Sequence, residues 1–380
     1  MNLEAAYPAA RIVAPKIHQY FARQAIEVQA AGGNGRFATL PSVESIQALV
    51  DVAFWASLRR EESFIPKISL AYLSPEESVA PLLLERPLPL DPGLLTKVSP
   101  AVERPGIHLG VSPQRDSLFV WGATRTIPRL CLVVEVAAAG LIVIKHHSHE
   151  TKGKYVNVAV LEGDQVKMID RRSASIPDSP ALMAALLGAE SSEGPAQSLN
   201  LLVQLAVSMR AHGRGGSLLV VPALAAPGTD HAWRESIVWP IPYLVSPPFS
   251  RLAELAREAN VEAARLDRTV DAVAGLTAVD GAVVLTDQLD VLAFGAKITR
   301  RKGHPLVEQV AVTEPIEGGE AELVHPEKLG GTRHLSAAQF VQDQHDSAAL
   351  VASQDGRFTI FEWSPAESIV HAHRIESLLL

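Results

Sequence analysis

The sequence predicts an α/β protein of two domains: an N-terminal mixed α/β domain, and a C-terminal compact α/β domain whose central mixed sheet is flanked by helices. Three observations support this fold class. The chain has 380 residues, which is long for one ordinary core. Hydrophobic residues make up 47 %, enough for globular folding. Helical and β patterns alternate, and a proline-rich passage at 237–248 marks a boundary between domains 1–240 and 241–380.

The first domain begins with two predicted helices, at residues 17–29 and 42–60. In the second, apolar residues recur at the three-and-four spacing of one buried face, and Ser42 is a suitable N-cap. Residues 65–73 form an apolar run that predicts a strand. The proline-rich residues 81–105 indicate a loop or extended chain.

A β-rich region follows from residue 117. The short apolar runs SLFVWGA, LCLVVEVA, GLIVIKHH and YVNVAVLEG are separated by turn residues and predict strands. Residues 198–212 have helical periodicity, GRGG ends that helix, and SLLVVP predicts a buried strand. We therefore expect the N-terminal half to be mixed α/β.

The second domain alternates helices and strand pairs. Residues 249–273 predict a long amphipathic helix. DGAVVLTDQLDVLAFGAKI predicts two strands, a helix follows Arg333-His334, and AALVASQDGRFTIFEW predicts a further strand pair. The resulting domain of about 130 residues is of ordinary size.

Composition disfavours several classes of partner. The formal charge is −8, with 34 basic and 42 acidic residues, so neither nucleic acid nor an anionic membrane surface is an expected partner. No apolar run is long enough to span a membrane, and residues 1–16 lack the pattern of a signal peptide. The single cysteine, Cys131, cannot form an internal disulfide. A cytoplasmic protein is the expectation.

Two histidine- and glycine-rich motifs are weak candidate sites. HHSHE contains His146, His147 and His149, but further metal ligands are not at a recognised spacing, so exposed histidines at a strand end are the favoured interpretation. HGRGG follows a helix and precedes a strand, the reverse of a phosphate loop, which favours a helix C-cap; His212 and Arg214 could still face a ligand in the first domain. No G-x-S-x-G elbow indicates a hydrolase.

The C-terminal domain has two motifs suited to a nucleotide. Asp280-Gly281-Ala282 precedes a strand, where a carboxylate can bind a metal ion and a glycine lets a ligand approach the backbone. Gly331-Thr332-Arg333-His334 supplies a hydroxyl, a guanidinium and an imidazole at the start of a helix. These groups can donate hydrogen bonds to a phosphate, and the helix dipole adds to the attraction of the anion.

In this order, the two motifs resemble those of the diadenylate cyclases, which condense two ATP into cyclic di-AMP. The likeness covers the last 130 to 140 residues: Asp280-Gly281-Ala282 with VVLTDQLDVLAFGAKI, then Gly331–His334 with Ser336-Ala337, then ALVASQDGRFTIF. The upstream helix, GRGGSLLVVP, Trp and PIPY resemble the N-terminal regions of some bacterial members, which are regarded as sensors. The first domain would thus respond to an unidentified small molecule or protein.

The resemblance implies a reaction and roles for residues. Each domain would hold one ATP with Mg²⁺ or Mn²⁺, and two domains would meet face to face in a homodimer. Asp280 would ligate the metal, and Arg333 and His334 would hold phosphates; all three are catalytic candidates. Thr332 and Ser336 would add hydroxyl donors. The candidates for shaping the nucleoside side of the ATP site are Gly281, Ala282, Phe294 and Gly295.

One position departs from the family. Its second motif is normally Arg-His-Arg, whereas the third position here is Leu335. If that arginine holds phosphate, its loss favours a catalytically inactive nucleotide-binding sensor on the same fold. If it has a packing role, activity survives. Lys297, Arg300, Arg301 and Lys302 are nearby cations that could compensate. A third reading, an unrelated α/β interaction protein, requires both motifs to be coincidental.

Overall fold

The computed structural model of the chain describes residues 6–30, 37–115, 117–147, 155–170, 172, 183, 196–223, 232–246, 252 and 263–380. The chain divides into two compact units, Met1–Ile169 with Leu380, and Asp170–Leu379. Both are mixed α/β, which confirms the predicted fold class. The division lies before the expected boundary at 240/241. The reason is that residues 216–221 form a central strand of the second unit's sheet, as described below.

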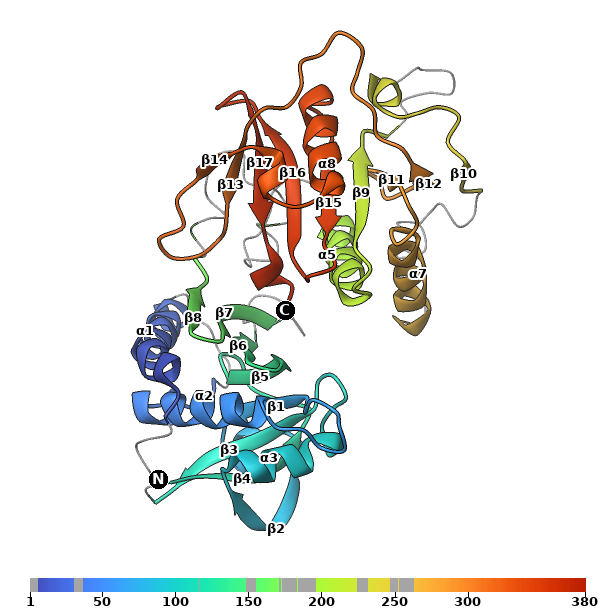
Figure 1. Cartoon of the computed structure of the whole chain (residues 1–380). Coiled ribbons are helices and arrows are strands. Elements are labelled where there is room, and N and C mark those ends of the chain that lie inside the picture. Colours follow the sequence, from blue (N-terminus) through green and yellow to red (C-terminus); the bar gives the residue numbers. More distant parts are fainter. Residues whose placement is uncertain are drawn as a thin grey trace. The chain divides into compact units, whose positions relative to one another are not determined.

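The described helices of the first unit are largely those that the apolar spacing predicts (Figure 1). They are α1 (Pro8–Ala30), α2 (Val43–Ser57) and α3 (Pro92–Val98), with short 3-10 turns η2 (Pro75–Glu77) and η3 (Ser99–Ala101). Ser42 is the N-cap of α2, and its hydroxyl oxygen accepts a hydrogen bond from the Ser45 N–H at 3.2 Å.

The sheet of the first unit has eight strands in the order β2-β4-β3-β1-β5-β6-β7-β8. Their bounds are β1 (Ile68–Tyr72), β2 (Leu82–Pro89), β3 (His108–Gln114), β4 (Ser117–Thr124), β5 (Leu132–Ala138), β6 (Leu141–His147), β7 (Tyr155–Glu162) and β8 (Gln165–Met168). β1 is parallel to β3 and antiparallel to β5, so the sheet is mixed.

The proline-rich residues 81–105 are more ordered than predicted, because they form β2 and α3. β2 is an edge strand, where a proline removes no ladder hydrogen bond that the sheet needs. α3 begins with Pro92 after Asp91, whose carboxylate accepts hydrogen bonds from two backbone N–H groups of the first turn.

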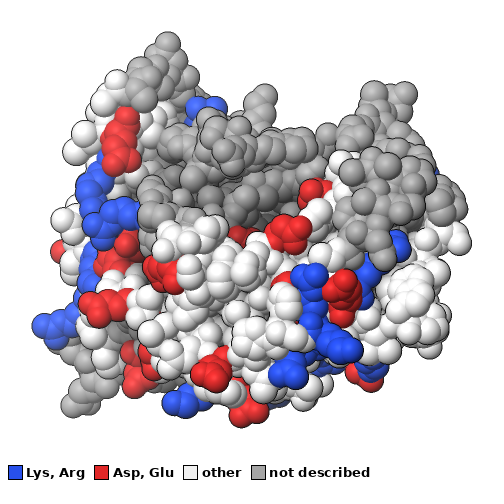
Figure 2. Space-filling view, turned by 90° about the horizontal axis from the view of Figure 1, so that it is seen from above, with Lys and Arg blue, Asp and Glu red and all other residues white. Residues whose placement is uncertain are grey.

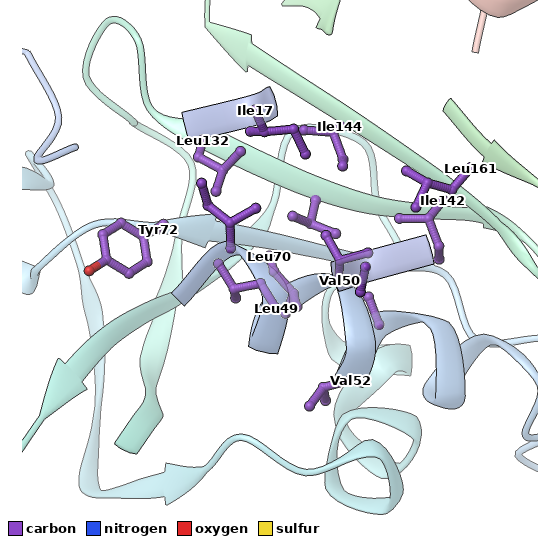
Figure 3. Packing of buried hydrophobic residues seen from close by; sticks show 14 of the residues in the cluster. Ile17, Leu49, Val50, Val52, Leu70, Tyr72, Leu132, Ile142, Ile144 and Leu161 are labelled. Carbon is purple, nitrogen blue, oxygen red and sulfur yellow. The ribbon is translucent and has the colours of Figure 1, made fainter. Parts of the chain in front are cut away.

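The core of the first unit lies between α1, α2 and one face of this sheet. Figure 3 shows Leu49 and Val50 of α2 close to Leu70 of β1. These side chains are at most 1 % exposed. Alternation along β1 places Leu70 and Tyr72 on this face and Ala71 on the other, where it packs with Trp121.

The second unit has three described helices and a nine-stranded sheet. The helices are α5 (Ala196–Ala211), α7 (Ala263–Leu276) and α8 (Thr332–Asp343), with 3-10 turns η5 (Ala232–Ser236), η6 (Pro326–Lys328) and η7 (Glu376–Leu378). Of the helix predicted at 249–273, α7 covers the last part and continues to Leu276. Residues 249–251 and 253–262 lie outside the described residues.

The strand order of the second sheet is β10-β12-β11-β9-β15-β16-β17-β13-β14. The bounds are β9 (Gly216–Val221), β10 (Tyr243–Leu244), β11 (Ala282–Thr286), β12 (Val291–Ala296), β13 (Val310–Thr313), β14 (Glu322–Val324), β15 (Ala348–Ala352), β16 (Phe358–Ser364) and β17 (Ile369–Arg374). β9 lies between β11 and β15, parallel to the first and antiparallel to the second.

Helix α8 covers one face of this sheet and contacts β9, β15, β16 and β17 (Figure 1). Phe340 of α8 and Phe361 of β16 are fully buried in the shared core. β9 and β15 are central strands, and α8 packs across both. The turn before β9 and the turn after β15 therefore lie at the N-terminus of α8. That junction holds the candidate site.

Candidate functional site

A cleft of ≈ 560 Å³ lies at the N-terminus of α8. Three chain segments form it: Asp280 before β11, residues 329–334 at the junction of η6 and α8, and the end of β15 with its following turn. Asp280, Thr332, Arg333 and His334, which the sequence predicts as site residues, therefore line one cavity. Their separation along the chain is bridged by the sheet.

Asp280 is exposed in the turn between α7 and β11. Its carboxylate forms an ion pair with Nζ of Lys297, and the two side chains are 92 % and 52 % exposed, respectively. The hydrogen bond and charge of Lys297 lower the pKa of Asp280, and the positive charge of Arg333 lowers it further. Asp280 is thus an anion at neutral pH.

Two glycines bring Lys297 to Asp280. Gly281 has a φ of +108°, and a Cβ atom on it would lie 2.4 Å from the carbonyl carbon of Gly295. Only glycine permits this approach of the two backbones. Ala282 pairs with Ala296 in the β11–β12 ladder, so the residues just outside that pair lie side by side.

The Arg333 guanidinium is positioned by the glycine turn before β9. A Cβ atom at Gly215 would lie 2.8 Å from Nη1 of Arg333 and 3.1 Å from the Ala352 carbonyl oxygen, and Gly215 has a φ of +69°. Gly215 of the HGRGG motif therefore packs against Arg333, a residue of the cleft, and the whole motif lies in the second unit. This corrects the expectation that His212 and Arg214 belong to the first domain.

The imidazole of His334 is buried, with an exposure of 3 %. A Cβ atom on Gly330 would lie 2.4 Å from Nδ1 of His334, so the ring packs closely against this glycine. The ring lies edge-on to that of Phe361, with the two ring centroids 6.1 Å apart. Burial lowers the pKa of His334, and Arg357 and Arg333 add to this, while Asp355 opposes it. The ring is neutral at pH 7. Among the described residues Nε2 has no hydrogen-bond partner, so a ligand or solvent must satisfy it.

The turn between β15 and β16 contributes cleft residues that sequence reasoning missed. Ser353, Gln354, Asp355 and Arg357 all line the cavity. The Nε of Arg357 lies 3.3 Å from a carboxylate oxygen of Asp355, so the guanidinium is held at the cavity by an ion pair. The quoted run ASQDGRF contained these groups. Their polarity resembled that of an ordinary hairpin turn, and only the pairing of β15 with β9 brings the turn to α8.

Residues 36–125, in the first unit, match the family described as probable sensor domain DACNV. This match covers α2, α3 and strands β1 to β4 of the first unit, and the cleft at the N-terminus of α8 lies outside it. Among curated proteins, no sequence matches the chain. The part of the chain that matches a sensor family therefore lies before residue 126. The GRGGSLLVVP and PIPY segments, which are expected from their sequence to belong to a sensor region, lie after it.

Several predicted site residues lie outside the cleft lining. Ala282 is 2 % exposed and packs in the core. Phe294 stacks on Tyr243 with ring centroids 4.7 Å apart, and Gly295 packs against the same Tyr243 ring. Ser336 is half-buried in the second turn of α8. With Gly281, these residues shape the neighbouring backbone rather than the cavity wall.

Leu335 also lies outside the cavity lining. Its partly buried side chain packs against the apolar core beneath α8. Of the cations near this sequence region, Lys297 reaches Asp280, whereas Arg301 forms an ion pair with Glu235 at 2.6 Å. Arg300 and Lys302 are exposed and do not line the cleft.

The donor set of the cleft fits a hard divalent cation bound together with substrate. Asp280 is ionised and open to solvent, and one or two carboxylates with substrate phosphates and water are the usual ligands of Mg²⁺. Within the described ranges, no group of three or more His, Cys, Asp and Glu side chains is arranged to hold a metal by itself. A metal here would need phosphate oxygens as further ligands.

The HHSHE motif belongs to the first unit and does not line this cleft. His146 is 1 % exposed, and its Nε2 lies 3.1 Å from the Tyr20 hydroxyl. His147 is half-buried at the end of β6, and His149 lies outside the described residues.

The surface has a mixed charge distribution on the side shown in Figure 2. Basic and acidic residues are interspersed over the described part of that face. None of the helices in the part of the chain that the structure describes combines the length and apolar character needed to cross a membrane.

Proposed function

We propose that the second unit binds ATP with Mg²⁺ or Mn²⁺ and condenses two ATP into cyclic di-AMP, and that the first unit regulates it. One observation carries the proposal: Asp280 and Thr332-Arg333-His334 converge on one polar cleft at a helix N-terminus. The resemblance of both motifs to diadenylate cyclases, and the association of the DACNV sensor domain with those enzymes, support it.

The chemistry needs positioning and neutralisation of charge. The 3′-hydroxyl oxygen of each ATP attacks the α-phosphorus of the other, the bond to pyrophosphate breaks, and the hydroxyl proton is released. Two phosphodiester bonds form and two pyrophosphates leave. A bound divalent ion would neutralise phosphate charge and lower the proton affinity of the hydroxyl.

The chain's own groups suit these demands. Asp280 would hold the cation, and the Arg333 guanidinium, against which Gly215 packs, would bind phosphate oxygens. Neutral His334 donates or accepts one hydrogen bond without adding charge. The Thr332 hydroxyl lies in the first turn of α8, where backbone N–H groups and the helix dipole favour an anion.

Arg357 offsets the departure at Leu335. Leu335 packs, partly buried, against the core and does not line this cavity, whereas Arg357 does. The number of guanidiniums at the cleft is therefore still two, Arg333 and Arg357. Leu335 remains the observation that favours the second candidate function, a catalytically inactive sensor that binds ATP or cyclic di-AMP.

The test is incubation of the full chain with ATP and Mn²⁺ and detection of cyclic di-AMP by mass spectrometry. Native protein should form product, and Asp280→Asn should abolish it. The matched control is Asp287→Asn at the other end of β11, where the carboxylate accepts a hydrogen bond from the backbone N–H of Ala223 at 3.0 Å. That variant should retain turnover.

The remaining outcomes separate the alternatives. ATP binding without product identifies the inactive sensor, and absence of both binding and product refutes the nucleotide site. Because neither ATP site closes the ring alone, the specific activity should rise with protein concentration as homodimers form. Specific activity independent of concentration down to the nanomolar range would contradict a transient face-to-face dimer.

A further inference from the structure

The proposed function assigns no role to Lys297, although this residue contacts the proposed metal ligand. Its Nζ donates a hydrogen bond to Oδ2 of Asp280 and forms an ion pair with that carboxylate. A divalent cation on the same oxygen would lie close to the ammonium group, and the two positive charges would repel each other. Lys297 and a metal ion therefore compete for Asp280.

The backbone fixes both ends of this ion pair. The carbonyl oxygen of Lys297 accepts a hydrogen bond from the N–H of Val238 at 2.8 Å. Asp280 is followed by Gly281, which packs so closely against Gly295 that a Cβ atom would not fit. The contact is thus built into the pairing of β11 with β12. Both side chains remain open to solvent, so an entering ligand can reach them.

The charges at the cleft favour a ligand that is negative as a whole. Among the lining residues, Arg333 and Arg357 are cations, and Asp280 and Asp355 are anions. Lys297 adds a third cation next to the wall. A free divalent ion would bring two more positive charges to this group, whereas a triphosphate that already carries a metal ion brings net negative charge.

We infer that Lys297 excludes a free divalent cation from Asp280 and releases the carboxylate only to a metal ion that arrives with a triphosphate. The triphosphate as ligand rests on the proposed function, whereas the exclusion of free metal does not. Lys297 is thus a control on the order of loading, in which metal and nucleotide enter together.

An exchange of partners explains the selectivity. When the metal–triphosphate complex enters, Asp280 passes from the ammonium group to the metal ion, and the ammonium group passes from Asp280 to a phosphate oxygen. The number of ion pairs is preserved. When a free metal ion enters, Lys297 loses its anion and is left beside a dication, so binding is weakened.

The first test measures free Mn²⁺ by electron paramagnetic resonance as the full chain is added without nucleotide. Lys297→Gln should bind Mn²⁺ at least about three-fold more tightly than native protein, the scale of one exposed ion pair. Asp280→Asn combined with Lys297→Gln should remove this gain, which assigns it to the carboxylate. Lys297→Arg keeps the charge and should bind Mn²⁺ as native protein does. Lys302→Gln, at an exposed site outside the cleft, should do the same.

The second test is calorimetric titration with the Mn²⁺ complex of α,β-methylene-ATP, an analogue that cannot lose pyrophosphate. Its affinity for Lys297→Gln should stay within about two-fold of native, because native protein exchanges one ion pair for another. A gain for the complex as large as that for free Mn²⁺ would refute the release of Asp280 by a triphosphate.

Two further outcomes separate this inference from the proposed function. Equal affinities of native protein and Lys297→Gln for free Mn²⁺, or a gain that persists without the Asp280 carboxylate, would overturn the exclusion of metal. Failure of the nucleotide complex to bind native protein would instead refute the nucleotide site and the release step with it. A gain for free Mn²⁺ in Lys297→Gln would still establish the exclusion.

Discussion

The ammonium group of Lys297 forms an ion pair with the carboxylate of Asp280, immediately beside the cleft at the N-terminus of α8. Lys297 follows β12 and Asp280 precedes β11, so the antiparallel pairing of these strands makes the contact. The ion pair keeps Asp280, the proposed metal ligand, ionised. The ammonium group of Lys297 must move away from the carboxylate when a metal ion binds there.

Lys297→Ala should raise the pKa of Asp280 towards its ordinary value, because the strongest hydrogen bond and charge that stabilise the carboxylate are removed. Arg333 remains and keeps part of the effect. Carboxyl ¹³C chemical shifts followed against pH, assigned with Asp280→Asn, measure this. Lys302→Ala, at an exposed site, is the control and should leave the titration unchanged. An unaltered Asp280 pKa in Lys297→Ala would show that the ion pair does not form in solution.

Gly215→Ala and Gly213→Ala separate backbone strain from displacement of Arg333. Both glycines have positive φ, +69° and +65°, so each alanine should cost about 1 kcal/mol of unfolding free energy, and the close contacts at Gly215 add to the cost there. Only at Gly215 would the new Cβ press on the Arg333 guanidinium. ATP affinity, measured by titration calorimetry, should therefore fall in Gly215→Ala and stay close to native in Gly213→Ala. Equal affinities would mean that Arg333 does not hold the nucleotide.

Arg357→Gln should weaken ATP binding about ten-fold, because a charge-assisted hydrogen bond at the cleft is lost. Arg300→Gln removes the same charge from an exposed residue outside the cleft and should have little effect. If the two variants bind ATP equally, Arg357 does not replace the missing arginine of the family motif.

Leu335→Arg restores the family's residue but should not strengthen ATP binding. Leu335 packs against the core beneath α8, so a guanidinium there should lower the free energy of unfolding by about 1 kcal/mol or more. Urea unfolding and ATP titration of the same preparation give both quantities, with Leu335→Met as the size-matched control. A gain in ATP affinity or turnover would show that residue 335 reaches the nucleotide.

The first unit should lose stability as the pH falls below neutral. Burial lowers the pKa of His108 to about 4 from an ordinary 6.5. Between these values the unfolded chain binds a proton that the folded chain does not, so the free energy of unfolding falls by up to about 1.4 kcal/mol per pH unit. Above pH 6.5 this histidine has no effect.

Urea unfolding between pH 4.5 and 7.5 tests this dependence. His108→Gln can keep one of the hydrogen bonds that His108 makes with Ser69 and Tyr155, and its stability should vary less steeply with pH. His325→Gln, which removes an exposed imidazole, should keep the native slope. A slope unaffected by His108→Gln would contradict a buried neutral imidazole.

Local patterns predicted the regular elements well where the signal lay within one element. The cap at Ser42, the strands β4 to β7 and the pair β11 and β12 follow from apolar periodicity and turn residues. The proline-rich passage at 237–248 is the basis for a predicted boundary at 240/241, whereas the compact units divide at 169/170. Its Tyr243–Leu244 pairs with β12, and no local feature distinguishes an edge strand from a linker.

Sequence alone determined which groups could bind a triphosphate, because carboxylate, guanidinium, imidazole and a helix start are chemical properties of Asp280 and Thr332–His334. Only the tertiary structure decided which of them meet. Pairing of β9 with both β11 and β15 brings Asp280, the Gly215 turn and Arg357 to the start of α8. The same packing sets Leu335 partly buried against the core, since a helix lying on a sheet must bury one face.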